Sequence, residues 1–251
     1  MQHRFSRTEM LIGKEGQQKL ANSFVAVFGI GGVGSFTVEA LARSGVGNIM
    51  LVDFDEVCIT NLNRQIHATS KTVGKKKVKV MEERLKLINP KINVKALAEF
   101  YNDKNHEMFF GEKLDYVVDA IDTVSGKLNL VEQSFERKIP IISAMGAGNK
   151  LKPELLEIED ISKTSICPLA RVMRKELRKR GIIKGLDVVY SKEKPLQPLL
   201  PSDCKSNCVC PGGDGHCTKK RQIPGSTSFV PSVAGLLMAG KVVNNIISYK
   251  R

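Results

Sequence analysis

One glycine-rich loop between a strand and a helix constrains this chain more than any other segment. The loop reads GIGGVGS over residues 29–35, an apolar run over 23–30 leads into it, and a helical pattern follows over 35–46. This is the G-x-G-x-x-G pattern in the strand–turn–helix context that it requires. Its glycines allow a tight turn and let a phosphate approach backbone N–H groups at a helix N-terminus. The loop therefore predicts a nucleotide site, although a tight turn without a ligand would have the same pattern.

Strand and helix patterns alternate through the rest of the first half. Further strands are predicted over 48–55, 92–100, 115–122 and 139–146, and further helices over 76–89 and 125–138. Elsewhere we predict a short helix from Ser6 to near Gly13, a basic helix over 169–181, a short strand over 188–194 and an apolar helix near 231–247. Strands spaced by helices form a parallel, doubly wound sheet. The predicted class is α/β, with a Rossmann-like core over 1–150 and an α/irregular extension over 151–251 packed on it.

Positive charge is concentrated in the second of these parts. The 251 residues carry a net charge of +13; residues 1–150 hold 21 basic and 17 acidic residues, and 151–251 hold 18 and 9. Such an excess attracts polyanions, although a solvated basic surface would give the same composition. No apolar run approaches the roughly 18 residues of a membrane span, and the first residues lack the apolar stretch of a secretory signal. We therefore expect a cytoplasmic protein.

Polar side chains after the predicted strands distinguish this site from that of a nicotinamide dehydrogenase. A nicotinamide site needs neither an Arg–Lys pair nor a further acid, whereas a nucleotide whose phosphates are split needs both. A P-loop is excluded because the nearest match, over 235–242, ends in Val242, which lacks the hydroxyl that binds Mg²⁺. The candidates for ATP binding are Gly29, Gly31, Gly32, Gly34, Asp53, Asp55, Asn61, Arg64, Gln65, Lys77 and Asp122.

The motifs GIGGVGS, LVDFDEV, NLNRQ, the lysine after VGKK, and DAID together resemble those of the adenylating E1-like superfamily, which includes ThiF, MoeB and the ubiquitin-activating enzymes. This resemblance implies transfer of AMP from ATP to a carboxylate with release of pyrophosphate. It also implies that the glycines hold the phosphates and that Asp53 holds the ribose. Asn61, Arg64 and Lys77 would then clamp the phosphates, and Asp122 would bind Mg²⁺.

An N-terminal motif implies a further catalytic residue. Arg7 lies in RFSRTE, which is similar to the RYxRQ motif of the superfamily. That arginine enters the site of a partner subunit in the family, so the resemblance implies a homodimer in which Arg7 acts in trans. The catalytic residues implied by the resemblance are Arg64, Lys77, Asp122 and Arg7.

The C-terminal part resembles one subgroup, the tRNA threonylcarbamoyladenosine dehydratases (TcdA or CsdL). The similar stretches are VCITNLNRQIHA (57–68), SAMGAGNKLKP (143–153), PLARVMRKELRKRGI (168–182), VVYSKEKPL (188–196) and SFVPSVAGLLMAGKVV (228–243). Members use ATP to activate the threonyl carboxylate of a modified adenosine beside the anticodon, which then cyclises with loss of water. The resemblance also implies a cysteine-desulfurase or sulfur-acceptor partner. Two alternatives are activation of the Gly-Gly tail of a sulfur-carrier protein, and a non-catalytic scaffold with a degenerate fold.

A basic stripe on the predicted helix 169–181 fits a tRNA substrate. Its members, three to seven residues apart or adjoining, are Arg171, Arg174, Lys175, Arg178 and Lys179. Residues at this spacing share a helix face, where they can contact phosphates without reading sequence. A solvated basic face remains the alternative.

The cysteines leave a second metal question open. Superfamily members that activate the tails of ubiquitin-like proteins usually carry two separated C-x2-C pairs for zinc, and this chain has none. Four clustered thiols, Cys204, Cys208, Cys210 and Cys217, could hold Zn²⁺ or stay free. Cys58 and Cys167 are interpreted as structural.

Overall fold

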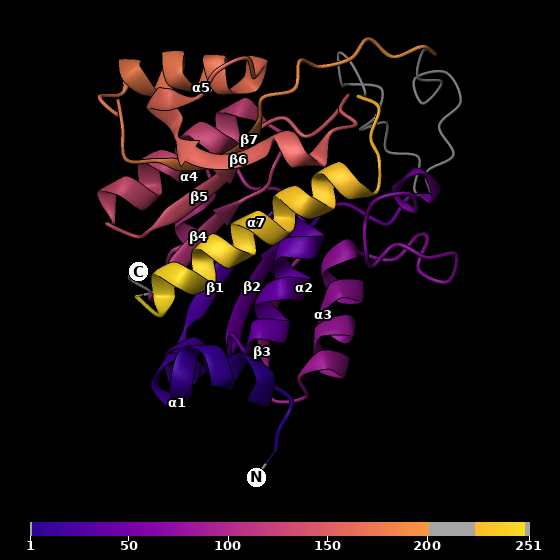
Figure 1. The fold of residues 1–251 in the computed structure, drawn as a ribbon, viewed down its shortest axis with the longest axis vertical. Helices are drawn as coiled ribbons and strands as arrows, with labels where there is room; N and C mark the ends of the chain where they lie inside the picture. The colour runs from indigo at the N-terminus through magenta and orange to yellow at the C-terminus, as the bar shows by residue number, and fades with distance from the viewer. Residues whose placement is uncertain (1, 201–223, 249–251) are drawn as a thin grey trace.

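The computed structural model describes residues 2–200 and 224–248, which form one twisted sheet between two helical layers (Figure 1). Seven strands lie in the order β3-β2-β1-β4-β5-β7-β6, and all neighbours are parallel except β6 and β7. The strands are β1 (Phe24–Phe28), β2 (Asn48–Val52), β3 (Asn93–Leu97), β4 (Tyr116–Asp119), β5 (Ile141–Ala144), β6 (Leu156–Asp160) and β7 (Asp187–Ser191). The predicted Rossmann-like class is confirmed.

The helices cover both faces of this sheet. They are α1 (Ser6–Asn22), α2 (Gly34–Ser44), α3 (Lys77–Ile88), α4 (Val124–Glu136), α5 (Pro168–Lys179) and α7 (Phe229–Ile246). One apolar core lies between the sheet and α2, α3 and α7, and the other lies between the sheet and α4 and α5. Because β1 is buried on both faces, its sequence is an uninterrupted apolar run rather than an alternating one.

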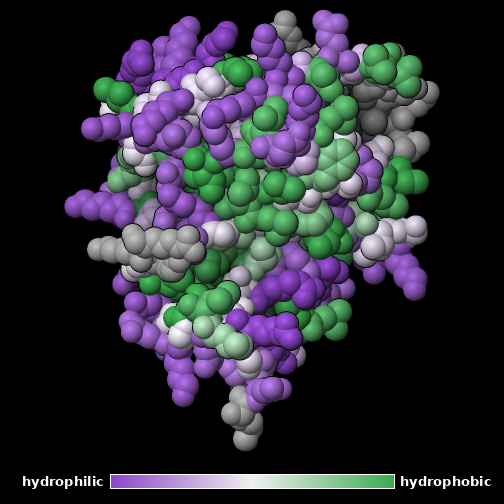
Figure 2. Space-filling model, viewed as in Figure 1, coloured by the Kyte–Doolittle hydropathy of each residue, from purple (hydrophilic) through white to green (hydrophobic). Residues whose placement is uncertain are grey.

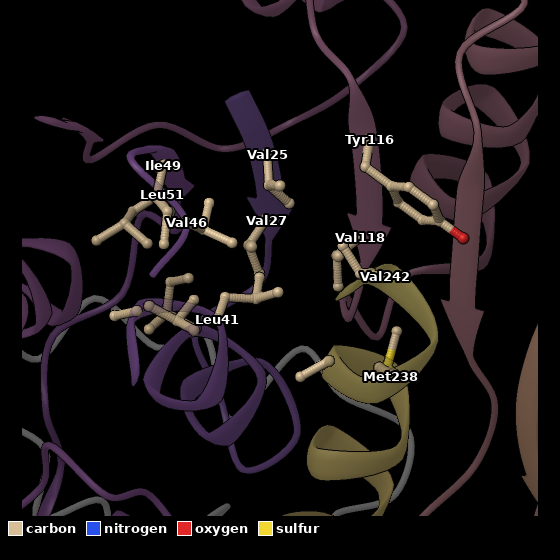
Figure 3. Packing of buried hydrophobic residues seen from close by; sticks show 14 of the residues in the cluster. Val25, Val27, Leu41, Val46, Ile49, Leu51, Tyr116, Val118, Met238 and Val242 are labelled. Atoms are coloured by element: carbon tan, nitrogen blue, oxygen red, sulfur yellow. The ribbon is translucent and has the colours of Figure 1, made fainter. Parts of the chain in front are cut away.

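Alternate residues of β1 serve the two cores. Val25 and Val27 belong to the core on the side of α2 and α7, together with Leu41, Met238 and Val242 (Figure 3). Ala26 and Phe28, the residues between and after them, belong to the opposite core. This alternation follows from the two-residue period of a strand.

The C-terminal residues complete the same sheet. β7 pairs with β5 in parallel, and β6 forms the antiparallel edge, so residues 156–191 contribute two strands to the first half's sheet. The boundary at residue 150 falls in the β5–β6 connection and stays a prediction. β6, LEIED, is not among the predicted strands because three of its five residues are acidic, which is tolerable at a sheet edge where every residue is only half-buried.

Helix α1 is longer than predicted. Gly13, expected near its end, has φ 72° and ψ 172°, and a second helical segment continues from this kink to Asn22. The glycine therefore breaks the helix without ending it.

Helix α7 crosses the front of the sheet beside α2 (Figure 1). Contact between the two helices is close: a Cβ on Gly235 would lie 2.3 Å from the Val33 carbonyl oxygen, and Thr37 Oγ1 donates to Gly235 O at 3.1 Å. Asn245 Nδ2 donates to Tyr116 Oη at 3.0 Å. By length and composition α7 could cross a membrane, and 39% of it is buried inside this fold.

Candidate nucleotide-binding site

The candidate site lies at the topological switch point of the sheet, between β1 and β4. β1 pairs with β2 on one side and with β4 on the other, so the chain leaves the carboxyl ends of β1 and β4 in opposite directions. Ligands of open α/β sheets bind in the crevice outside such a point. The glycine loop follows β1, two acids follow β2, and the loop that carries Asp122 follows β4. Tertiary structure thus brings three separate motifs to one edge.

The glycine loop is shaped by contacts that exclude side chains. Gly29 has φ 87°, and a Cβ there would lie 2.6 Å from the Ala120 carbonyl oxygen. A Cβ on Gly34, the first residue of α2, would lie 1.8 Å from the Gly29 carbonyl oxygen. Gly31 faces open space, since a Cβ added there would meet nothing within 4 Å. The loop is a cradle that lets a phosphate approach the backbone at the start of α2.

Asp53 braces this loop from the end of β2. Its Oδ2 accepts a hydrogen bond from Ile30 N at 2.6 Å, and its Oδ1 accepts one from Asp55 N at 2.9 Å. A carboxylate has about four lone-pair positions, so these bonds leave capacity for ribose hydroxyls. Asp53 therefore fixes the loop's conformation, a role that the sequence did not suggest, and remains a candidate ribose ligand.

Lys77 is a buried cation at the start of α3. Its Nζ lies 2.6 Å from Asp55 Oδ2, and its backbone N–H donates to Asp55 O at 3.1 Å. Burial opposes its charge, but the two carboxylates Asp53 and Asp55 outweigh burial and raise the pKa of Lys77. The side chain is thus a permanently charged group of fixed position, as stabilisation of a phosphoryl transition state requires.

The NLNRQ segment closes the site from the other side. Asn61 ends a short 3-10 turn, η1 (Ile59–Asn61), and its side chain accepts from Cys58 N at 3.1 Å. Arg64 lies against the glycine loop: its Cγ would be 3.4 Å from a Cβ on Gly32, and its Nη1 donates to Thr60 O at 2.7 Å. Asn61 therefore shapes the segment. The stem of Arg64 lies beside the glycine loop, and its guanidinium bonds to the segment that carries it.

Gln65 and His67, farther along this segment, are buried with unsatisfied polar atoms. Gln65 Oε1 and both ring nitrogens of His67 have no hydrogen-bond partner among the residues that the structure describes. Only 2% of His67 is exposed. Burial, with the charges of Lys77 and Arg84, lowers the pKa of His67 to about 3, so its ring is neutral. Sequence reasoning missed His67, because a histidine in a polar loop does not signal burial.

Asp122 is the exposed acid of the loop after β4. A divalent cation in such a site commonly takes one or two carboxylates and completes its shell with phosphate oxygens and water. Among residues 2–200 and 224–248 no group of three or more His, Cys, Asp or Glu forms a metal cage. An exposed carboxylate beside a phosphate cradle is the donor set that suits Mg²⁺ carried in with a nucleotide. The magnesium assignment remains a prediction.

The predicted basic stripe lies on the outer face of α5. Met173 and Leu177 are buried, while Arg171, Lys175 and Arg178 are exposed on the opposite side. These three, with Arg174 and Lys179, line a shallow depression of about 390 Å³. The basic residues predicted to share a helix face therefore do lie together on the solvent-facing side of α5.

Arg174 is the member of the stripe that is already engaged. Its Nη1 donates to the Thr164 carbonyl oxygen at 2.9 Å and also to the Thr164 hydroxyl, and the residue is half-buried. It ties α5 to the segment before it. The guanidinium of Arg174 is therefore less available to contact a phosphate than those of Arg171 and Arg178.

The remaining predicted residues lie away from this edge or outside the described residues. Arg7 is exposed in the first turn of α1, which packs at the amino ends of β1 and β2. Cys58 and Cys167 are buried, in keeping with a structural role. The four clustered cysteines, Cys204, Cys208, Cys210 and Cys217, lie outside the described residues, and their zinc site stays a prediction.

Comparison with known proteins identifies the family. The ThiF family model matches residues 5–251. A tRNA threonylcarbamoyladenosine dehydratase of Bacillus subtilis is 50% identical over 98% of this chain and 96% of its own length. The chain belongs to the ThiF family, and within it to these dehydratases. Both resemblances stated from the sequence are confirmed.

Solved structures agree with this assignment. The crystal structure of the Escherichia coli dehydratase TcdA in complex with ATP superposes with a TM-score of 0.84, at 33% identity, over 98% of this chain and 94% of that one. The E. coli molybdopterin-synthase adenylyltransferase, a relative of the sulfur-carrier type, is 34% identical over only 61% of this chain. The similarity that continues through the C-terminal part therefore favours the dehydratases over the sulfur-carrier alternative.

Proposed function

We propose that this protein uses ATP to activate the threonyl carboxylate of threonylcarbamoyladenosine in tRNA and promotes its cyclisation with loss of water. The observation that carries the proposal is the meeting of a phosphate cradle, Lys77, Arg64 and Asp122 at one switch point in a chain 50% identical to such an enzyme. A buried lysine and a positioned arginine suit phosphoryl chemistry, in which charge grows on the phosphate oxygens.

The reaction proceeds in two steps. A carboxylate oxygen of the substrate attacks the α-phosphorus of ATP, the bond to the β-phosphate oxygen breaks, and pyrophosphate leaves. A carbamoyl nitrogen of the same nucleotide then attacks the activated carbonyl carbon, a proton is lost from that nitrogen, and AMP leaves. The sum is removal of one water from the substrate, so the chemistry requires no enzyme thiol.

The chain's own residues supply position and charge for these steps. The glycine loop and Asp53 orient the nucleotide, while Lys77 and Arg64 neutralise charge at the phosphates. Asp122 would hold Mg²⁺, which when bound neutralises phosphate charge.

The tRNA would lie along α5. Helix α5 begins directly after Cys167, whose Sγ is 3.9 Å from a Cβ position on Gly146, and Gly146 follows β5 at the carboxyl edge. The basic face therefore starts at the edge that carries the nucleotide site. A polyanion held there by phosphate contacts can present one nucleotide to that edge.

Mass spectrometry of tRNA that carries threonylcarbamoyladenosine tests the function directly. Incubation with the protein and ATP should remove one water from the modified nucleoside and release AMP and pyrophosphate. Unmodified tRNA, which lacks the carboxylate, is the matched control and should give no AMP. Adenylation of a sulfur carrier's Gly-Gly tail, without any response to modified tRNA, would contradict the proposal and support the alternative.

We infer that the protein works as a homodimer with Arg7 in trans. Arg7 lies on α1 at the amino ends of the strands, whereas the nucleotide site lies at their carboxyl ends, and this placement supports a role at the site of another copy. Apolar side chains gather on the outer surface along α7, among them Phe229 and Leu236, which are 44% and 49% exposed (Figure 2). A second copy would cover this surface.

Mixing two inactive variants tests the arrangement in trans. Arg7→Ala and Lys77→Met should each lack activity alone. A heterodimer of the two contains one site with both native residues, so a mixture at equilibrium should regain about a quarter of the wild-type activity if subunits exchange at random. No recovery in a mixture shown by native mass spectrometry to contain heterodimers would exclude Arg7 from the partner's site. The sulfur-acceptor partner stays a prediction.

A further inference from the structure

We propose that Lys127 is a positioning residue that sets the affinity of the Asp122 loop for a metal–nucleotide complex. This inference rests on the proposed function, because it concerns the same site. Its basis is a fully buried group of three polar side chains beneath the loop, Asp119, Lys127 and Ser143, none of which the proposed chemistry uses.

The three side chains come from three different elements. Asp119 is the last residue of β4, Lys127 lies in the first turns of α4, and Ser143 is in β5. Lys127 Nζ lies 2.9 Å from Asp119 Oδ2, and the Ser143 hydroxyl donates to the same oxygen at 2.5 Å. Both charged side chains are completely buried. The cluster therefore locks the carboxyl ends of two strands to the helix that follows the loop.

Lys127 also holds the loop itself. Its Nζ donates to the Ile121 carbonyl oxygen at 3.2 Å, and that carbonyl belongs to the peptide group whose nitrogen is in Asp122. Asp119 Oδ1 accepts from Ile121 N at 3.3 Å. The residue immediately before Asp122 is thus held at both its N–H and its C=O by one ion pair.

Packing around the loop leaves it little other freedom. A Cβ on Gly126 would lie 2.8 Å from Ile121 Cδ1, and Ala120 N donates to Phe28 O at 2.8 Å. The Ala120 carbonyl in turn lies against Gly29. A displacement of the Ile121 carbonyl would therefore change the distance between Asp122, which would hold the metal, and the glycine loop, which would hold the phosphates.

Stability alone is a weak reason for such a pair. The desolvation penalty for burying two charges offsets much of their mutual attraction. Replacing a buried ion pair by well-packed uncharged residues therefore often leaves stability unchanged or raises it. A role in holding one conformation accounts for what stability does not. Partners that orient a metal ligand typically contribute 10- to 100-fold to metal affinity.

The test compares a neutral pair with a folded control. Asp119→Asn combined with Lys127→Met removes both charges together, so no charge is left buried and unpaired. Ser143→Ala removes one hydrogen bond to Asp119 but leaves Lys127 bonded to Ile121. The readout is the affinity for Mn²⁺ in complex with a non-hydrolysable ATP analogue, measured by electron paramagnetic resonance, beside the affinity for the analogue without metal.

We expect the neutral pair to keep a near-native thermal midpoint and metal-free analogue affinity, and to bind the manganese complex roughly tenfold more weakly. Ser143→Ala should match the wild type. An unchanged manganese affinity in the neutral pair, or equal weakening in both variants, would overturn the inference. If the neutral pair does not fold, the single variants Lys127→Met and Lys127→Gln replace it. Only the glutamine keeps a donor for the Ile121 carbonyl, so equal manganese affinities in the two would overturn the inference. A wild-type protein that binds no metal–nucleotide complex would instead contradict the proposed function.

Discussion

The carboxyl edge of the sheet and the outer face of α5 both present positive charge, but they hold it in different ways. At the edge, Lys77 is buried and bonded to Asp55 at 2.6 Å, and the loop beside it is fixed by Asp53. On α5, Arg171 and Arg178 lie exposed on a helix whose other face is in the core. The difference follows from the two ligands: a transition state must be met at fixed positions, whereas a phosphate backbone needs only positive charge within reach.

The largest effect is expected at the buried lysine. Lys77→Met should lower the rate of AMP formation by about 10²- to 10³-fold, because one preorganised charge is lost from the phosphates. Lys76→Met is the matched control: this neighbour is exposed and pairs with Glu56 at 3.2 Å, and its loss should change the rate less than twofold, as surface pairs contribute little. Single-turnover kinetics measure both rates. Equal losses would mean that position matters no more at the edge than on the surface.

A pH-dependent difference in stability is expected at His67, on the buried side of the comparison. The folded pKa is about 3 and the unfolded value about 6.5, so the ring's contribution is fully present above pH 6.5 and is lost as pH falls toward 3. As the pH falls from 7.5 to 5, the unfolding free energy of the wild type should fall by about 2 kcal/mol more than that of His67→Leu, whose side chain cannot be protonated. Urea unfolding at the two pH values measures this difference. Parallel pH profiles for variant and wild type would mean that His67 is protonated or solvated in the fold.

A smaller effect is expected on the exposed face. Arg171→Glu with Arg178→Glu should weaken tRNA binding by about tenfold or more and reduce the salt dependence of binding by roughly two phosphate contacts, with ATP affinity unchanged. Filter binding at several salt concentrations, beside calorimetry with ATP, provides both measurements. Loss of ATP affinity together with tRNA affinity would show that the face and the edge are not separate.

The smallest effect is expected at Arg174, where the comparison is sharpest. Because its guanidinium bonds to Thr164, Arg174→Ala should lower the unfolding free energy by about 1 kcal/mol and weaken tRNA binding less than Arg171→Ala does. Denaturant unfolding and filter binding of both variants test this. A greater loss of tRNA binding from Arg174 than from Arg171 would return it to the phosphate-binding set.

Most of the fold was predictable because the strand signals are strong. The apolar runs of β1, β2, β4 and β5 indicate the sheet, although every predicted strand continues past its true end. At β2 and β4 the excess residues include the site acids Asp53, Asp55 and Asp122, which look like strand ends because apolar residues precede them. β6 could not be predicted, since an edge strand needs no continuous apolar pattern.

The candidate site was predictable to the extent that its motifs are local. Asp53 was expected at the ribose, but only the structure shows that both its oxygens hold backbone N–H groups of the chain itself. The same limit applies to Arg174 on α5. Helical spacing places it in the stripe, whereas its bond to Thr164 depends on a segment that no helical pattern includes.

The sequence by itself determined the class of fold, the phosphate loop and the family, because each depends on residues that are adjacent or regularly spaced. Only the tertiary structure decided which charges are free to meet a ligand. In the sequence, Lys77, Lys127 and Arg174 are each a basic residue on a predicted helix. In the fold, Lys77 is paired with Asp55 at the site, Lys127 is buried against Asp119, and Arg174 bonds to the Thr164 carbonyl. Burial and partners depend on the packing of distant elements, and these set whether a charge acts on a ligand or on the protein itself.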